Sequence, residues 1–265
     1  MKTDNSDFKI YRLDSVESTN RYCEALDLKQ VEDFTCFWAL EQTAGIGQRG
    51  NHWEAAPGKN LTFSLVLHPT FLPAERQFRL TQALSLAVVD FLSTFYYSIH
   101  IKWPNDIYIS GHKICGILTS AHVTPKIVKQ SNSQTIISSA VCGIGLNVNQ
   151  TDFPDWVPNP TSLAILTGKE YKLEPLLRQL LACIEKRYEA LRADVDFEQE
   201  YLEHLLNLGL LARYKYKGEV ITATVTGVDP HGHLLLTTTD GRHLCCAMKE
   251  IAAIDCCALS SSPRG

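Results

Sequence analysis

Short apolar blocks bounded by turn residues predict a series of strands in the first half of the chain. One begins at Tyr11, and the clearest others span 34–40, 61–67 and 135–141. A polar segment at 123–135 lies between two of these patterns and predicts a loop.

The segment from 99 to 118 organises the rest of the chain. Two apolar runs flank a Pro104-Asn105-Asp106 corner and a third follows a Ser-Gly-His turn, so we expect strands at 99–103, 107–109 and 113–118. Burying these strands beside Lys102, Asp106 and Lys113 is costly unless the charges meet a partner or a ligand.

Apolar residues at helical spacing predict the helices. They are expected at 73–97, 174–191 and 196–208, with shorter ones at 161–168 and from Ser18 or Thr19 to about 28. Because strands and helices are grouped unevenly, the pattern indicates an α+β fold with a mixed or antiparallel sheet.

From Leu211 the pattern changes to short alternating strands separated by tight turns such as Lys217-Gly218 and Asp240-Gly241. This change predicts a separate small β-barrel. We therefore divide the chain into residues 1–210, a barrel at 211–256 and a polar tail at 257–265.

The composition is that of an ordinary soluble protein, with 265 residues, 45% hydrophobic residues and a net charge of −4. A negative chain argues against a protein that lives on nucleic acid or on an anionic membrane. No apolar run reaches the length of a membrane span, and the polar start does not resemble a signal peptide, so we expect a cytoplasmic protein.

Nine cysteines are scattered along the chain, never in Cys-x-x-Cys spacing, which favours free thiols in a reducing compartment. Cys245 and Cys246 are neighbours in a strand pattern, so their thiols should point to opposite faces. His231 and His233 occur at a turn, where solvated side chains are expected. We predict no metal site from these residues.

A glycine-rich segment follows the second predicted strand. Gly45-x-Gly47-x-x-Gly50 has the letters of a dinucleotide fingerprint, but the segment after it continues as loop rather than as an apolar helix. A surface loop without function is one interpretation. The other is a binding loop, whose backbone N–H groups and Arg49 suit a phosphate.

The trio Ser18-Thr19-Asn20 also has two interpretations. Ser18 or Thr19 is a natural N-cap, so the trio can simply start a helix. Alternatively, its hydroxyl and amide groups face a ligand. Both can hold at once.

These motifs, in this order and spacing, resemble the biotin–protein ligases. The resemblance covers about residues 8 to 254 and is carried by the trio above, Glu41-Gln42-Thr43-Ala44-Gly45-x-Gly47, Trp53, Lys102-Trp103-Pro104-Asn105-Asp106, Lys113-x-x-Gly116-Ile-Leu and Gly143-Ile-Gly145-Leu-Asn147-Val-Asn149. It implies a class II synthetase-like catalytic domain, with a mixed or antiparallel sheet and helices on one side, followed by an SH3-like C-terminal domain. The chain begins at the catalytic domain, so we expect no DNA binding.

The resemblance implies a two-step ligation that needs ATP and Mg²⁺. Biotin is activated as biotinyl-5′-AMP, and a lysine of a biotin carboxyl carrier domain then accepts the biotinyl group. No membrane partner is expected, and homodimerisation is left open. The nearest alternatives are a lipoate or octanoate ligase or transferase, and a biotin-binding module without catalysis. Retention of both Lys113 and Arg49 favours an enzyme.

By the same resemblance, candidate residues fall into three groups. Catalytic roles are expected for Lys113, Arg49 and Asp106. Biotin binding is expected for Ser18, Thr19, Asn20, Gln42, Gly45, Lys113 and Gly116. ATP or adenylate binding is expected for Ile46, Gly47, Gln48, Arg49, Gly50, Trp53, Asn105 and Asn147.

Two positions of the glycine-rich segment depart from the pattern of the family. Relatives usually carry arginine after the first glycine of the loop, and many carry another after the second, whereas this chain has Ile46 and Gln48. Arg49 is then the loop's one cation, so we expect weaker retention of the adenylate unless another group compensates.

Overall fold

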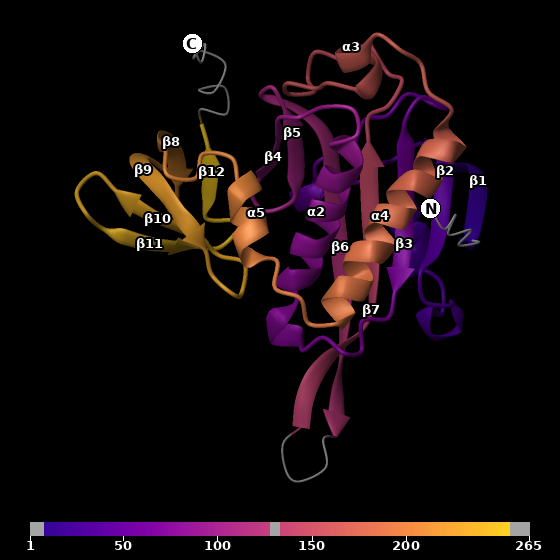
Figure 1. Cartoon of the computed structure of the whole chain (residues 1–265), viewed down its shortest axis with the longest axis horizontal. Helices are drawn as coiled ribbons and strands as arrows, with labels where there is room; N and C mark the ends of the chain where they lie inside the picture. Colours follow the sequence, from indigo (N-terminus) through magenta and orange to yellow (C-terminus); the bar gives the residue numbers. More distant parts are fainter. Residues whose placement is uncertain (1–7, 128–132, 255–265) are drawn as a thin grey trace.

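A mixed seven-stranded sheet, in the order β1-β2-β3-β7-β6-β5-β4, forms the centre of the larger part of the molecule (Figure 1). The computed structural model describes residues 8–127 and 133–254. β1 and β2 pair in parallel, and the other neighbours pair antiparallel. The strands are β1 (Ile10–Val16), β2 (Thr35–Gln42), β3 (Leu61–Leu67), β4 (Ile99–Lys102), β5 (Asp106–Ile109), β6 (His112–Ile127) and β7 (Ser133–Leu146).

The helices lie on both faces of this sheet, and the two long ones share one face. The α-helices are α1 (Thr19–Glu24), α2 (Phe78–Leu92), α3 (Leu163–Thr167), α4 (Leu173–Arg192) and α5 (Glu198–His204), and 3-10 turns occur at η1 (Leu28–Gln30), η2 (Gln48–Gly50) and η3 (Ala74–Arg76). α2 and α4 lie together over the sheet in Figure 1. The α+β prediction is confirmed.

The alternation of side chains along β2 and β3 separates two cores. Cys36 and Leu65 point into the large core that includes α2 and α4, whereas Phe37 and Val66 pack with Cys23 of α1. Successive residues of a strand face opposite sides, so α1 lies on the face away from the long helices. The expectation of helices on one side therefore needs correcting for α1.

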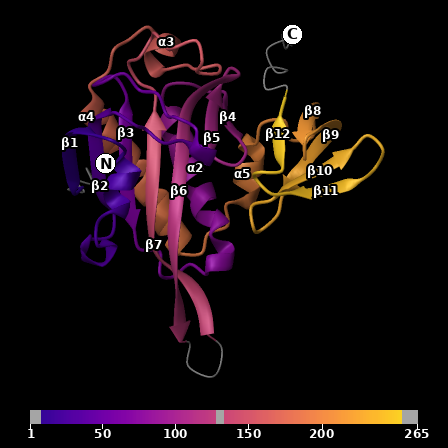
Figure 2. The same ribbon diagram turned by 180° about the vertical axis from the view of Figure 1, so that it is seen from behind.

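A long hairpin of β6 and β7 projects from the sheet (Figures 1 and 2). The loop expected at 123–135 is wrong at both ends, because β6 continues to Ile127, β7 starts at Ser133, and Val123 pairs with Ile137. Two neighbouring strands can pair through their backbones while their side chains stay solvated, so polar composition does not exclude a strand. Residues 128–132 lie outside the described part of the chain.

Four helices, α1, α2, α3 and α5, are shorter than the apolar spacing predicts. α1 ends at Glu24 rather than near 28, because Leu26 and Leu28 turn back against the core around Cys23. α2 ends at Leu92 rather than at 97, and α5 covers only the middle of the expected 196–208. Helix ends are set by such tertiary contacts as much as by local pattern.

The C-terminal part forms a five-stranded antiparallel sheet in the order β11-β10-β9-β8-β12. Its strands are β8 (Leu211–Tyr216), β9 (Glu219–Val228), β10 (Leu234–Thr238), β11 (His243–Cys246) and β12 (Ile251–Ala253). The short alternating strands expected from Leu211 onward are therefore present. As expected, Cys246 is buried and Cys245 is exposed.

This small sheet contacts the larger part of the molecule at the Trp103 corner. Trp103 Nε1 donates a hydrogen bond of 3.0 Å to the Gly232 carbonyl. Gly232 has a φ of +89° and lies so close to Phe78 of α2 that an added Cβ would be 2.5 Å from the ring. Tyr201 of α5 supports the other side of the corner by donating to the Pro104 carbonyl at 2.7 Å. Within residues 8–127 and 133–254, no helix is long and apolar enough to cross a membrane.

Candidate active site

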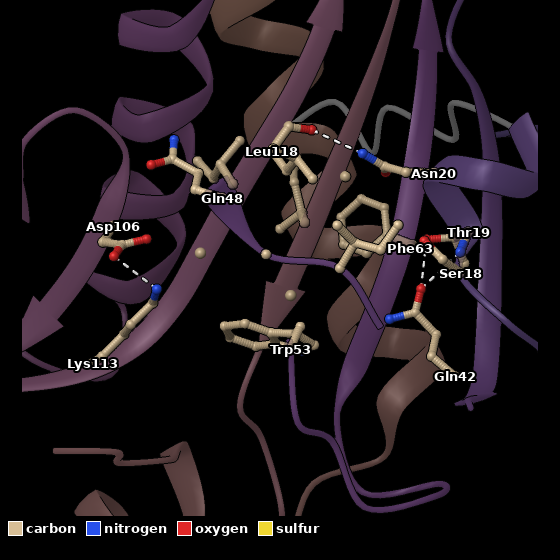
Figure 3. Close-up of a pocket in the computed structure, with 17 residues that line it drawn as sticks. Ser18, Thr19, Asn20, Gln42, Gln48, Trp53, Phe63, Asp106, Lys113 and Leu118 are labelled. Atoms are coloured by element: carbon tan, nitrogen blue, oxygen red, sulfur yellow. Dashed lines mark hydrogen bonds and ion pairs between the residues drawn. The ribbon is translucent and has the colours of Figure 1, made fainter. Parts of the chain in front are cut away.

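The candidate site lies on the sheet face that α2 and α4 leave uncovered. There Ser64 of β3 is the cross-strand partner of Gly143 of β7, and Gly145 is the partner of Gly116 of β6. α1 occupies the neighbouring part of this face. The cavity is enclosed between α1, the glycine-rich segment and the start of β5 (Figure 3).

Hydrogen-bonding side chains gather at one end of the cavity. Gln42 Oε1 accepts from the Thr19 backbone N–H at 2.7 Å and from the Thr19 hydroxyl at 3.1 Å. The Ser64 hydroxyl lies 2.7 Å from Thr19 Oγ1 and 2.5 Å from Asn20 Oδ1. Asn20 Nδ2 in turn donates to the Leu118 carbonyl at 3.2 Å. This network holds the side chains in place, so they present fixed donors and acceptors to a polar ligand.

Ser18 satisfies both interpretations of the Ser-Thr-Asn trio. It occupies the N-cap position of α1 with an extended backbone, yet its side chain makes no capping hydrogen bond. The residue also lines the cavity. The helix start therefore places Ser18 where its hydroxyl can serve a ligand instead.

Glycines form the floor of the cavity because nothing larger fits. A Cβ at position 143 would lie 2.1 Å from Asn20 Oδ1, and one at position 145 would lie 2.3 Å from Trp53 Cε2. Real Cβ atoms do not approach other atoms so closely. The Gly-Ile-Gly motif therefore lets Asn20 and the Trp53 indole lie directly on the sheet.

Lys113 and Asp106 occupy the opposite end of the cavity. Lys113 Nζ lies 2.7 Å from Asp106 Oδ2, and each side chain is 27% exposed, so the pair is partly shielded from solvent. The partner that these charges need is thus present, as the sequence predicts. The backbone of Lys113 is held in place by an isolated β-bridge to Pro160.

A bulge brings Lys113 into the site. Lys113 and Gly116 are three residues apart, so regular alternation would place them on opposite faces. The pairing of β5 with β6 shifts by one residue between Ile107 and Tyr108, which leaves Asp106 opposite Gly116 and Tyr108 opposite Lys113. The extra residue returns Lys113 to the face of Gly116, a use of bulges that is common beside active sites.

The glycine-rich segment folds into a small hairpin over the cavity. Ile46 pairs with His52, Gly47 N donates to the Asn51 carbonyl at 2.6 Å, and Trp53 N donates to the Gly45 carbonyl at 2.9 Å. The hairpin delivers Trp53 onto the glycine floor, with its ring 5.6 Å from Lys113 Nζ. The buried Trp53 Nε1 has no hydrogen-bond partner within the described residues.

Trp53 and Lys113 line three adjoining cavities. The first is the polar one described above. A second lies between the Trp103 corner and the C-terminal sheet. The third extends past Asn147 to an aromatic and proline-rich wall. Groups bound in the three cavities would therefore come together beside Trp53 and Lys113.

Most expected site residues line these cavities, and two do not. Ser18, Thr19, Asn20, Gln42, Ile46, Gly47, Gln48, Trp53, Asp106, Lys113 and Gly116 line the first, while Gly50 and Asn147 line the third. Gly45 is buried under Trp53, and Asn105 is buried and donates to the Ile117 carbonyl, which ties the corner to β6. The side chain of Arg49 lies outside the described part of the structure.

Sequence reasoning missed Ser64 and the wall of the third cavity. Ser64 interrupts the apolar run of β3, and a polar residue inside a strand buried along its whole length was the available signal. The wall contains Phe153, Trp156 and Pro158. Trp156 is 57% exposed, and an exposed tryptophan beside a cavity is a common mark of a binding surface.

Burial disfavours the thiolate form of the cysteines near the cavity. Burial raises the pKa of Cys23 and of Cys142 to about 12 and raises that of Cys115 further. A thiol with so high a pKa carries almost no thiolate at neutral pH. These cysteines act as small apolar residues of the core.

Comparisons with known proteins agree with this geometry. Residues 13–140 match the profile of the Biotin/lipoate A/B protein ligase family. The bifunctional ligase/repressor BirA of Bacillus spizizenii is 31% identical over 238 residues, which cover 88% of this chain and 70% of that protein. The biotin--[acetyl-CoA-carboxylase] ligase of Mycobacterium tuberculosis is 29% identical, over 75% of this chain and 71% of that protein.

A solved structure is similar over almost the whole chain. The biotin protein ligase from Aquifex aeolicus in complex with biotin and ATP has a TM-score of 0.72 and 25% identity, covering 92% of this chain and 98% of that one. The chain therefore belongs to the biotin/lipoate A/B protein ligase family and, within it, to the biotin–protein ligases.

Proposed function

We propose that this enzyme activates biotin with ATP and transfers it to a lysine of a biotin carboxyl carrier domain. The observation that carries the proposal is the layout of the first cavity, with a fixed polar network at one end and Lys113 at the other. The Mycobacterium tuberculosis relative and the Aquifex aeolicus structure are named for biotin rather than for lipoate, which disfavours the lipoate and octanoate alternatives.

The polar end suits the ureido ring of biotin. A ureido group offers one carbonyl acceptor and two N–H donors, so it needs both kinds of partner. Ser18, Thr19 and Gln42 supply hydroxyl and amide groups there. The apolar remainder of biotin would lie along Ile117, Ile144 and the glycine floor.

A methyl group at position 143 should impair this subsite. We expect Gly143→Ala to weaken biotin binding about 10- to 100-fold, because the new Cβ displaces Asn20 and overpacking typically costs 1–3 kcal/mol. Isothermal titration with biotin measures the effect. Gly227→Ala is the matched control, since a Cβ there meets only Leu235 at 3.9 Å. Unchanged binding in Gly143→Ala contradicts the prediction.

The first step places the biotin carboxylate beside the α-phosphate of ATP. A carboxylate oxygen attacks phosphorus, the bond to pyrophosphate breaks, and biotinyl-5′-AMP results. Both reactants are anions, so the site must hold them together and offset the charge on the transferring phosphoryl group. Lys113 is the proposed source of that charge. Arg49 and the backbone N–H groups of the 45–50 segment are proposed to hold the phosphates.

The third cavity is the proposed adenosine subsite. Asn147 Oδ1 is buried there and has no hydrogen-bond partner in the described residues, while Asn147 Nδ2 donates to the Thr161 carbonyl at 2.9 Å. An orphaned buried acceptor suits the amino group of a purine. Trp53 borders this cavity, and Trp156 offers a further aromatic surface.

Mg²⁺ is proposed to accompany ATP and to offset phosphate charge when bound. It usually binds through substrate phosphates plus one or two carboxylates. Asp106 is the carboxylate residue among those lining the first cavity, so it fits this role. We also propose that Asp106 orients Lys113 or the incoming amine.

In the second step, the acceptor lysine attacks the biotinyl carbonyl, its amine loses a proton, and AMP leaves. The second cavity is the proposed entry for that lysine, because it opens between the Trp103 corner and the C-terminal sheet and reaches Lys113. We propose that residues 1–210 form the catalytic domain and that 211–256 form an SH3-like domain that helps to dock the carrier. The antiparallel order of β8 to β12 supports this division.

Pyrophosphate exchange tests the proposed function. Incubation with ATP, Mg²⁺ and labelled pyrophosphate should exchange label into ATP with biotin but not with lipoate or octanoate. Label exchange with lipoate alone supports the lipoate alternative. Absence of exchange with saturable biotin binding supports a binding module without catalysis.

A further inference from the structure

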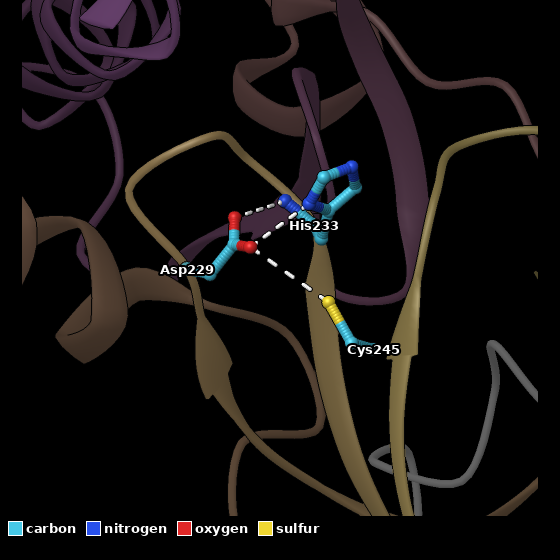
Figure 4. Close-up of side chains that lie close together, drawn as sticks. All are labelled: Asp229, His233 and Cys245. Carbon is cyan, nitrogen blue, oxygen red and sulfur yellow. Dashed lines mark hydrogen bonds and ion pairs between the residues drawn. The ribbon is translucent and has the colours of Figure 1, made fainter. Parts of the chain in front are cut away.

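Three side chains with metal-ligating atoms meet on the C-terminal sheet (Figure 4), and none of them lines the three cavities of the proposed active site. Asp229 directly follows β9, His233 directly precedes β10, and Cys245 lies on β11. Their ligand atoms lie within 4.8 Å of one another. Asp229 Oδ2 is 2.8 Å from His233 Nδ1 and 3.7 Å from Cys245 Sγ.

The cluster is held in place by its backbone. Asp229 Oδ1 accepts from the N–H groups of His231 at 2.9 Å and His233 at 2.8 Å, which fixes the carboxylate and leaves Oδ2 facing the other two side chains. Cys245 pairs with Leu235 on the neighbouring strand, so its position is set by the sheet. Both groups therefore need little rearrangement to share a ligand.

The spacing and the atom types fit a transition metal. Tetrahedral coordination with bonds of about 2.0–2.3 Å separates the ligands by about 3.3–3.8 Å. The 3.7 Å between Asp229 Oδ2 and Cys245 Sγ lies in this range, and the 2.8 Å hydrogen bond from His233 would lengthen on metal binding. One thiolate, one imidazole and one carboxylate form a donor set that suits Zn²⁺ or Co²⁺, whereas Mg²⁺ prefers oxygen ligands. A cysteine–histidine nucleophile fits less well, because the thiol contacts the carboxylate rather than the imidazole.

We propose that Asp229, His233 and Cys245 bind one transition-metal ion of the zinc class, and that this ion stiffens the turn at which the C-terminal sheet contacts the Trp103 corner. The fourth position would hold water. Gly232, the residue next to His233, accepts the Trp103 hydrogen bond and packs against Phe78. An ion that joins β9, β10 and β11 would therefore restrain the same turn from its outer side.

Cobalt spectroscopy tests the site on the full chain, reduced and freed of metal by a chelator. Co²⁺ should bind with a stoichiometry of one, with a thiolate-to-cobalt charge-transfer band, and Zn²⁺ should displace it. Cys245→Ser should abolish that band. His233→Ala should weaken binding by more than about 100-fold, the upper end of the loss from removing an outer-shell partner alone.

The control variants decide which residues are responsible. His243→Ala removes an exposed histidine of the same sheet, and the Cys256→Ser, Cys257→Ser double variant removes the thiols that follow β12 in the sequence; both should bind Co²⁺ as the wild type does. A band that survives Cys245→Ser, or disappears in the Cys256→Ser, Cys257→Ser variant, overturns the assignment. So does the absence of saturable binding, which would make the cluster a hydrogen-bonded turn only.

Hydrogen exchange tests the coupling to the corner. Zn²⁺ should slow exchange in peptides covering 229–233 and 101–106 of the wild type, and should leave both unchanged in Cys245→Ser. Slowing confined to 229–233 would retain the metal site and refute the coupling. These readouts do not depend on ligase activity, so they can fail or succeed separately from the proposed function.

Discussion

Lys113→Ala is expected to lower the rate of biotinyl-5′-AMP formation about 100- to 1,000-fold, while biotin binding weakens by much less. Losing a single preorganised group that stabilises transition-state charge costs about that much. Lys113 lies at the junction of the three cavities, so its charge is positioned where carboxylate and phosphate meet. A charge needed more in the transition state than in the ground state affects rate before affinity.

Single-turnover formation of labelled adenylate measures the rate, and titration with biotin measures the affinity. Lys186→Ala is the control for loss of a lysine, because Lys186 is exposed on α4, on the far side of the sheet. Asp106→Asn keeps the lysine and removes the carboxylate 2.7 Å from Nζ, so it measures the combined contribution of Asp106 to positioning Lys113 and to Mg²⁺. A near-normal single-turnover rate in Lys113→Ala would exclude the proposed role.

The elements whose residues are determined by their neighbours in the sequence were predicted correctly. β3 is buried along its whole length and reads as a strand, and α4 shows apolar residues at helical spacing. Ser162 caps α3 by accepting from Ile165 N, and Gly168 ends that helix with a φ of +68°, so α3 lies within the expected 161–168. Residues within or next to these elements are enough to specify where they begin and end.

The remainder depends on contacts that are distant in sequence. The ends of β6 and β7 that project beyond the sheet are strands because they pair with each other. The polar composition of 123–135 gives no sign of this pairing. Similarly, the bulge that turns Lys113 into the site follows from the register of β5 on β6. Neither the extended β6–β7 pairing nor the bulge can be predicted from the spacing of apolar residues.

The candidate site divides in the same way. The Lys113–Asp106 pair was foreseeable, because charges beside buried strands need partners. Ser64 stands out in the sequence only as a polar residue in an apolar strand. Its role was not foreseeable, since it depends on Thr19 and Asn20 of α1, which pack across the sheet. The third cavity was also hidden, because its wall comes from an irregular segment without a repeating pattern.

Ile46→Arg is expected to reduce the escape of biotinyl-5′-AMP from this enzyme, with labelling of bystander proteins falling about tenfold or more. Three backbone N–H groups of the hairpin, those of Gly47, Asn51 and Trp53, are already used inside it. Among the side chains described at the first cavity, Lys113 is the one permanent cation, so few groups are left to hold the phosphate. A restored charge-assisted contact contributes about 1.5–3 kcal/mol.

The test incubates each variant with biotin, ATP, Mg²⁺ and a lysine-rich bystander protein, and follows both bystander labelling and the lifetime of the bound adenylate. Ile46→Gln is the matched control, because it adds length and polarity without charge and should leave leakage near the wild-type level. Arg49→Ala should increase leakage if Arg49 is the remaining phosphate contact of the loop. If the wild type labels no bystander, or if Ile46→Arg changes neither labelling nor adenylate lifetime, another group already compensates for the missing arginines. The assignment of the 45–50 segment to the phosphate would then be wrong.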